Sequence, residues 1–158
     1  MESMKTTTVP SPALFALLRI YLGVIFLFAA VPKWTRGHFA TSMGRFLQTM
    51  TPNAIPPYRE FIAQVVLPHA AVFATVIATT ELIVGLLLLT GTATRLAAVG
   101  AMFLLLNYML AKGMWFWIPA SNDAALFFIA LVVALGAAGR AAGFDRYLAR
   151  RWPGVPIW

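Results

Sequence analysis

Two charged residues, Arg19 and Glu81, lie inside apolar segments of the sequence, where a charge needs a chemical reason. An uncompensated charge in hydrocarbon costs at least ~2.5–3.5 kcal/mol, so each side chain requires a partner or a cavity. Consecutive spans run antiparallel, which places Arg19 roughly 9 Å and Glu81 roughly 13 Å from the same side at ~1.5 Å per residue. An arginine side chain covers that difference. The sequence therefore predicts a guanidinium–carboxylate ion pair between the two.

This predicted pair has two interpretations. An intramembrane carboxylate is a candidate for a proton relay, a contact to a quinone headgroup or an ion site. A structural ion pair that fixes the register of two helices explains the same residues equally well. Asn107 and Tyr108 are further polar groups for a pocket, although Asn107 lies too far from Glu81 in depth for direct contact.

Several other chemistries are excluded by the residues present. The chain has no cysteine, which excludes thiolate metal sites, iron–sulfur clusters and cysteine nucleophiles. Its two histidines, His38 and His69, lie in a connection and at a segment boundary, so haem within this chain and a transition-metal site are not expected. There is no glycine-rich phosphate loop. We expect no metal and no covalently bound cofactor.

The elements that must position these residues are transmembrane helices. The 158 residues are 61% hydrophobic and only 11% charged, against roughly 25% charged in soluble domains. About 20 apolar residues cross a core ~30 Å thick, and four segments qualify, at about 13–31, 69–90, 94–111 and 123–142. The prediction is an all-α integral membrane protein, a four-transmembrane-helix bundle forming a single domain over 1–158. A cleaved signal peptide is the alternative for the first segment, but that segment is longer than a signal peptide's apolar region and contains Arg19.

Helix-terminating and N-capping residues support these boundaries, and small residues indicate which helix faces meet. Pro32 is expected to end the first helix, and Ser121, Asn122 and Asp123 supply N-cap chemistry for the fourth. Small residues share a face of the second helix with Glu81, and Gly23 follows Arg19 by four positions. Small residues let helices approach closely, so these faces are predicted to meet.

The long connection between the first two spans carries a predicted helix. Apolar residues recur at helical spacing in HFATSMGRFLQTM, from His38 to Met50, with polar residues on the other face. This pattern is typical of a short amphipathic helix lying in the membrane interface. A second short helical run, Tyr58 to Leu67, follows Pro56 and Pro57. The connection is either a lid over the mouth of the bundle or a filler at headgroup level.

Aromatic and basic residues at the span ends indicate interfacial anchors. These are Lys33 and Trp34 after the first span, and Trp115 and Trp117 after the third. The twelve Lys and Arg lie singly in connections rather than along one face, which favours lipid headgroups over nucleic acid as partners. Six of them, including Lys5, fall on the side of the termini and five on the other, so the positive-inside rule only weakly favours cytoplasmic termini for this multi-pass protein.

Three stretches of the sequence resemble the DoxX/DoxD-like membrane proteins. They are LLRIYLGVIFLFAAVPKW (Leu17 to Trp34), ELIVGLLLLTGTATRLAA (Glu81 to Ala98) and GAAGRAAGFDRYL (Gly136 to Leu148). The positions that match the family are Arg19, Gly23, Lys33, Glu81, Gly85, Gly91, Arg95, Gly139, Arg140 and Asp145. The family's usual glycine before the lysine is replaced by Ala30-Val31-Pro32.

The resemblance implies a four-helix bundle in a prokaryotic plasma (inner) membrane, of a family named after subunits of thiosulfate:quinone oxidoreductase. On that basis we expect a small membrane subunit of a quinone-linked oxidoreductase, with quinone bound near Arg19, Glu81, Asn107 and Tyr108. A partner subunit or further copies of the chain would complete the complex. The alternatives are a non-catalytic assembly or scaffold subunit and, less favoured because no inverted repeat is visible, a small-solute or proton transporter.

Overall fold

The computed structural model describes residues 11–136, 138–155 and 157; Lys5, counted for the orientation, lies outside them. Every regular element in this part of the chain is helical. Three helices have the length and apolar character to cross a membrane: α1 (Pro12–Thr35), α4 (Ala70–Thr90) and α5 (Thr94–Lys112). The all-helical fold, predicted from the apolar segments of the sequence, is thereby confirmed for the described residues.

The fourth predicted segment differs from expectation. Its helix, α6 (Asn122–Leu135), is apolar but only 14 residues long. It ends at Gly136, and a separate short helix, α7 (Ala138–Ala142), follows. Residue 137, inside the predicted span 123–142, lies outside the described residues. The count of four membrane crossings therefore stays a prediction.

The first helix is longer than the sequence suggested. Pro32, expected to end it, lies inside α1, which continues to Thr35. A proline lacks the N–H that would bond the carbonyl four residues earlier, and this loss is tolerated here in the last turn. The extension keeps Lys33 on the helix instead of releasing it into the connection.

The first and second long helices pack with their backbones close together. A Cβ added at Gly23 of α1 would lie 2.8 Å from the backbone nitrogen of Leu89, and one at Gly85 of α4 would lie 3.1 Å from that of Leu27. Only residues without a side chain permit this approach. The predicted contact between the small-residue faces is confirmed, and it sets the register of α1 against α4.

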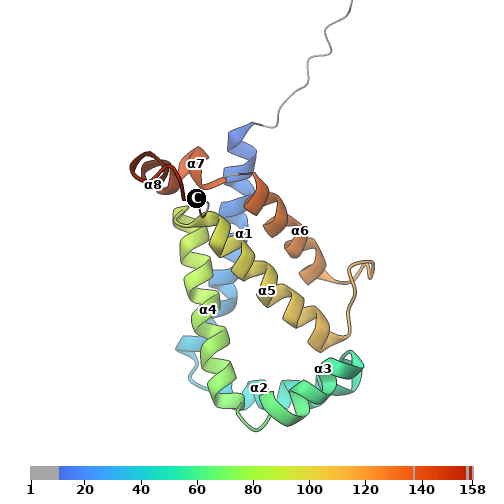
Figure 1. Cartoon of the computed structure of the whole chain (residues 1–158). Coiled ribbons are helices and arrows are strands. Elements are labelled where there is room, and N and C mark those ends of the chain that lie inside the picture. The colour runs from blue at the N-terminus through green and yellow to red at the C-terminus, as the bar shows by residue number, and fades with distance from the viewer. Residues whose placement is uncertain (1–10, 137, 156, 158) are drawn as a thin grey trace, which may run out of the picture.

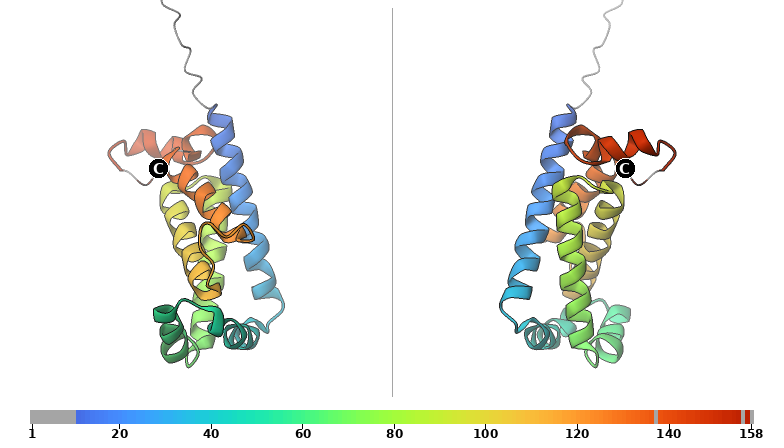
Figure 2. Two further views of the ribbon diagram at one scale, coloured as in Figure 1. Left: turned by 90° about the vertical axis from the view of Figure 1, so that its right-hand side faces the viewer. Right: turned by 90° about the vertical axis from the view of Figure 1, so that its left-hand side faces the viewer.

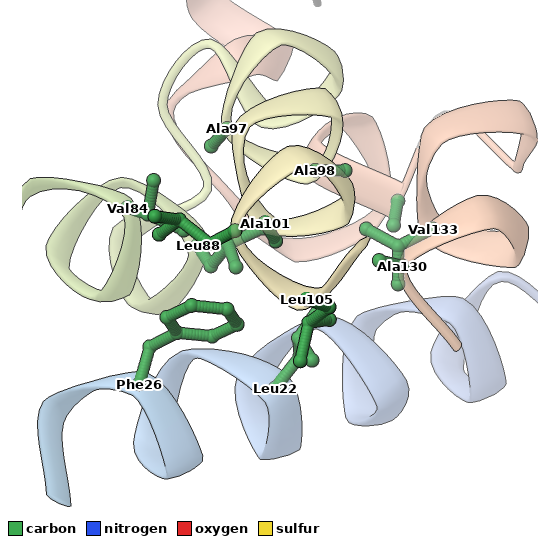
Figure 3. Close-up of a cluster of buried hydrophobic side chains, with 12 residues drawn as sticks. Leu22, Phe26, Val84, Leu88, Ala97, Ala98, Ala101, Leu105, Ala130 and Val133 are labelled. Atoms are coloured by element: carbon green, nitrogen blue, oxygen red, sulfur yellow. The ribbon is translucent and has the colours of Figure 1, made fainter. Parts of the chain in front are cut away.

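The core of the bundle is shared by four helices (Figure 3). Phe26 of α1 points toward Leu88 of α4, and Leu22 of α1 points toward Leu105 of α5. The other buried core residues of these helices are Val84 from α4, Ala97, Ala98, Ala101 and Leu104 from α5, and Ala130 and Val133 from α6. Alanines packed beside the larger side chains let the four helices interdigitate.

The connection between α1 and α4 closes one end of the bundle, here called the α2 end (Figures 1 and 2). It comprises α2 (Phe39–Met50), the 3-10 turn η1 (Thr51–Asn53), α3 (Pro56–Phe61) and the π-helical turn η2 (Ile62–Val66). Met43 and Leu47 on the apolar face of α2 pack with Ile62, Val66 and Ala74 in a second core cluster. The predicted amphipathic helix is therefore present, and its place in the membrane interface stays a prediction.

The opposite end, here called the α8 end, is covered by α7 and α8 (Asp145–Arg151) (Figures 1 and 2). The backbone nitrogens of Phe144 and Asp145 donate to the carbonyls of Thr90 and Gly91, at 3.3 and 2.8 Å. The segment after α7 is thus tied directly to the turn between α4 and α5.

Candidate functional site

The carboxylate of Glu81 is buried in the middle of α4, where its residue is only 1% exposed, and both of its oxygens have partners. Lys33 Nζ donates to Oε2 and forms an ion pair with it. The hydroxyl of Tyr108 donates to Oε1 at 2.6 Å. One acidic group therefore joins three helices, α1, α4 and α5.

Lys33 reaches Glu81 because α1 does not stop at Pro32. Lys33 follows the buried Phe26 and Ala30 by seven and three positions, which places it on the same inward face. Its ammonium lies 4.9 Å from the ring centre of Phe39 on α2, a cation–π contact. The sequence predicts Lys33 as an interfacial anchor; in the structure its ammonium instead pairs with Glu81 inside the bundle, and its side chain is 21% exposed. The periodicity Phe26, Ala30, Lys33 is the sequence signal that indicates this position.

A hollow of about 200 Å³ opens beside the ion pair at the α2 end. We call it the lysine hollow; it is lined by Lys33, Trp34, Gly37 and Phe39 and, on α4, by Ala74, Thr75 and Ala78. Ala78 and Ala74 lie on the face of α4 that carries Glu81, about one and two turns away from it. The volume is smaller than the ~300–1,000 Å³ of pockets for drug-sized ligands. The hollow is therefore of a size for a single ring, and Trp34 and Phe39 give it aromatic walls.

Asn107 and Tyr108 are neighbours in sequence but serve different contacts. Asn107 Oδ1 accepts a hydrogen bond from the hydroxyl of Tyr58 on α3 at 2.6 Å, and its Nδ2 donates to the Phe103 carbonyl. Burial raises the pKa of Tyr58 above its usual range. Asn107 therefore holds α3 of the connecting segment against α5, whereas Tyr108 donates to the carboxylate of Glu81.

Arg19 lies near the other end of the bundle, is 1% exposed, and does not meet Glu81. Its Nη2 donates to the carbonyl of Ala142 at 2.8 Å. Nη1 occupies the space left by two glycines, Gly91 and Gly143. Among the described residues, its Nε and Nη1 have no hydrogen-bond partner.

The predicted pair of Arg19 and Glu81 is therefore wrong, and the helix register gives the reason. Gly23 lies against Leu89, eight residues after Glu81, so Glu81 is level with about residue 31 of α1. That is twelve residues beyond Arg19, or about 18 Å along the helix axis. Depth counted from the ends of the two apolar segments misplaces Arg19 relative to Glu81, because α1 extends beyond the turn after α4 and the two ends are not level.

Asp145 has a role that the sequence argument did not identify. It is fully buried, and its carboxylate accepts hydrogen bonds from the backbone nitrogens of Ala93 at 2.6 Å and Thr94 at 2.9 Å. These are orphan donors at the start of α5, a helix without a capping side chain of its own. The signal in the sequence is Ala93 at the N-cap position of α5, since alanine cannot cap the helix and a partner from elsewhere is needed. At the start of α6 the expected cap is present, because Ser121 accepts from the Ala124 nitrogen.

The predicted aromatic anchors lie on the surface. Trp34, Trp115 and Trp117 are 51%, 41% and 74% exposed. Trp115 and Trp117 stack with their ring centres 5.4 Å apart, and neighbouring Lys112 pairs with Asp123 at 2.7 Å. Their anchoring role stays a prediction. Within the described ranges, no group of three or more His, Cys, Asp or Glu side chains is placed to hold a metal ion.

Comparison with known proteins gives one match. The family described as DoxX matches residues 14–116, which include Arg19, Lys33, Glu81 and Tyr108. No curated protein and no solved structure matches the chain.

Proposed function

Because the chain belongs to the DoxX family of membrane proteins, we propose that it is a small membrane subunit of a quinone-linked oxidoreductase of the thiosulfate:quinone type. In this proposal a quinone headgroup occupies the lysine hollow. One observation carries it: the buried cluster of Lys33, Glu81 and Tyr108 meets, through Lys33, a ring-sized hollow with aromatic walls.

The chemistry of the hollow fits a quinone. A quinone headgroup is a flat apolar ring with carbonyl oxygens that accept hydrogen bonds, and its reduction to the quinol takes up two electrons and two protons. Trp34 and Phe39 offer ring faces, and the Lys33 ammonium offers a charge-assisted donor beside them. Glu81 stabilises that ammonium from behind, and the Tyr108 hydroxyl donates to the other oxygen of the same carboxylate.

The electrons must come from outside this chain. We assign the electron-transfer centre to a partner subunit. The exposed faces of α1, α4 and α5 would contact the lipids of the bilayer. The proposed location is the prokaryotic inner membrane with cytoplasmic termini, an orientation that places the α2 end and its hollow on the outer side. Arg19 takes no part in this site, because it lies about 18 Å away along α1.

Quinone binding is tested on the purified chain in mild detergent, by titrating decylubiquinone and following tryptophan fluorescence. Trp34 lines the hollow, so saturable quenching is expected, and Trp34→Phe should remove its saturable part. Lys33→Met and Glu81→Gln should weaken binding about tenfold or more. Arg150→Gln removes an exposed charge from α8, at the opposite end of the bundle, and serves as the control. Quenching that is not saturable, or equal losses in Arg150→Gln, would contradict the proposal.

A second function is favoured by a separate feature of the same cluster. Glu81 joins three helices, as a structural clamp in a non-catalytic assembly or scaffold subunit would. The two functions differ in the Glu81→Gln variant of the native complex. The quinone proposal expects the complex to assemble with reduced quinone-dependent turnover, whereas loss of assembly with no separate activity defect supports the scaffold.

A further inference from the structure

A second hollow, of about 290 Å³, lies on the outside of the α8 end. We call it the arginine hollow; it is lined by Thr90, Ala142, Gly143, Phe144, Arg146 and Tyr147. It is distinct from the lysine hollow and has no part in the proposed quinone chemistry. Three features of its surroundings indicate what it binds.

The first feature is the positive charge of two arginines around the hollow. Arg146 lines the hollow and is exposed. Arg19 lies beneath it, in the space left by Gly91 and Gly143, and within the described residues its Nε and Nη1 have no hydrogen-bond partner. Asp145, which interacts electrostatically with Arg19, is fully buried and accepts hydrogen bonds from the amides of Ala93 and Thr94. The hollow is therefore a site for an anion.

The second feature is an apolar path that leads from the hollow along α4. The Thr90 hydroxyl donates to the Leu86 carbonyl one turn earlier, so both residues share a face of the helix. Leu86 and, three residues earlier, Ile83 are 48% and 51% exposed on that face. They offer a track for a hydrocarbon chain that runs from the hollow toward the middle of the membrane.

The third feature is a rim of exposed aromatic side chains on the segment that covers this end. Phe144 and Tyr147, which line the hollow, are 59% and 63% exposed. Tyrosine, with an apolar ring and a polar hydroxyl, is enriched at the level of lipid headgroups. The position of Tyr147 on the rim therefore favours a hollow at the depth of a lipid phosphate.

We propose that the arginine hollow binds the phosphate of an anionic phospholipid, with Arg146 as its surface contact, Arg19 as the buried positive charge beneath it, and an acyl chain along Leu86 and Ile83. The bound lipid ties α8 to the end of α4. The basis is this chain's own residues, so the proposal is independent of the quinone site.

The experiment uses the full chain, purified in mild detergent, with phosphatidylglycerol and phosphatidylcholine as competing probes in native mass spectrometry. Retention of phosphatidylglycerol over phosphatidylcholine is expected, together with a rise in melting temperature when phosphatidylglycerol is added. Arg146→Gln should lower the apparent affinity for phosphatidylglycerol about tenfold, the effect of losing one charge-assisted contact. Arg146→Lys should recover part of it.

Two controls keep this test decisive. Arg150→Gln removes a charge from the same helix outside the hollow, and Arg45→Gln removes an exposed charge from the other end of the bundle. Both should bind nearly as the unaltered protein does, and circular dichroism should show all variants folded. Equal losses in the three variants, or equal retention of the two lipids, overturn the proposal. Inorganic phosphate that stabilises the protein through Arg146 as strongly as phosphatidylglycerol does would identify a free-anion site and overturn the lipid.

Discussion

Lys33 and Glu81, 48 positions apart in sequence, form an ion pair that fastens the last turn of α1 to the middle of α4. The carboxylate is buried among apolar helices, so its charge has to be compensated from within the bundle. Lys33 supplies that charge and still reaches a hollow at the surface.

Replacing Lys33 alone should lower the free energy of unfolding more than replacing Lys33 and Glu81 together. Lys33→Met leaves a buried carboxylate without its cation, and up to about 3–5 kcal/mol of unfolding free energy should be lost. The double variant Lys33→Met/Glu81→Gln should recover part of this loss. Reversible unfolding in mixed micelles measures the coupling. Lys112→Met, whose partner Asp123 lies nearer the surface, should cost about 1 kcal/mol or less; a larger loss there would contradict this view.

A single added methyl group should separate α1 from α4. Gly23→Ala places a Cβ 2.8 Å from a backbone nitrogen of the facing helix, which cannot move as a flexible side chain would, so a loss of about 1–3 kcal/mol is expected. Gly44→Ala in α2 is the matched control, because the nearest new neighbour of its Cβ is the side chain of Ala70 on α4, at 3.9 Å. That variant should be neutral or gain up to about 1 kcal/mol from helix propensity. Thermal melts of both variants side by side decide the matter.

Loss of the remote cap should open the start of α5. Asp145→Ala removes the acceptor for the nitrogens of Ala93 and Thr94, and a cap of this kind contributes ~0.5–2 kcal/mol. Hydrogen–deuterium exchange should rise at these two amides while the centre of α5 stays protected. Glu60→Ala, which removes an exposed carboxylate, should leave the exchange pattern as it is. Unchanged protection in Asp145→Ala would show that water or another group satisfies these donors.

Tyr58, which donates a hydrogen bond to Asn107, should lose its proton only at a higher pH than an exposed tyrosine does. Burial raises the pKa of Tyr58, so its neutral form is favoured in the folded state. The resulting stabilisation is complete below the ordinary value of ~10 and is lost as the pH rises through the higher folded value. Ultraviolet titration should show a late tyrosinate step that Tyr58→Phe removes and that Tyr21→Phe, on an exposed position, does not. A late step that survives Tyr58→Phe would assign it to another residue.

The long elements of the fold were predictable because they follow from local physics. Apolar length predicts α1, α4 and α5, helical periodicity predicts α2, and serine chemistry predicts the start of α6. The burial of Glu81 and its need for a partner were also predictable, because a carboxylate in an apolar segment must be compensated.

The identity of that partner was not predictable by the same means. Pro32 is normally read as the end of a helix, and this reading placed Lys33 in the interface. Depth counted from segment ends then left Arg19 as the only cation for Glu81. The true register comes from Gly23 and Gly85, whose contact across two helices is a property of packing. The cap by Asp145 is likewise a contact between residues about fifty positions apart.

The length of α6 bears on the surrounding bilayer. Its 14 residues rise only about 21 Å, whereas the hydrocarbon layer is ~30 Å thick. A fourth membrane crossing through α6, which stays a prediction, would leave a hydrophobic mismatch on one side of the molecule, since α1, α4 and α5 are all longer. Lipids next to α6 would have to thin locally, at a cost of a fraction of a kcal/mol per ångström, and burial against another protein would remove that cost. On this prediction, the side of α6 is where a neighbouring subunit would gain most by docking.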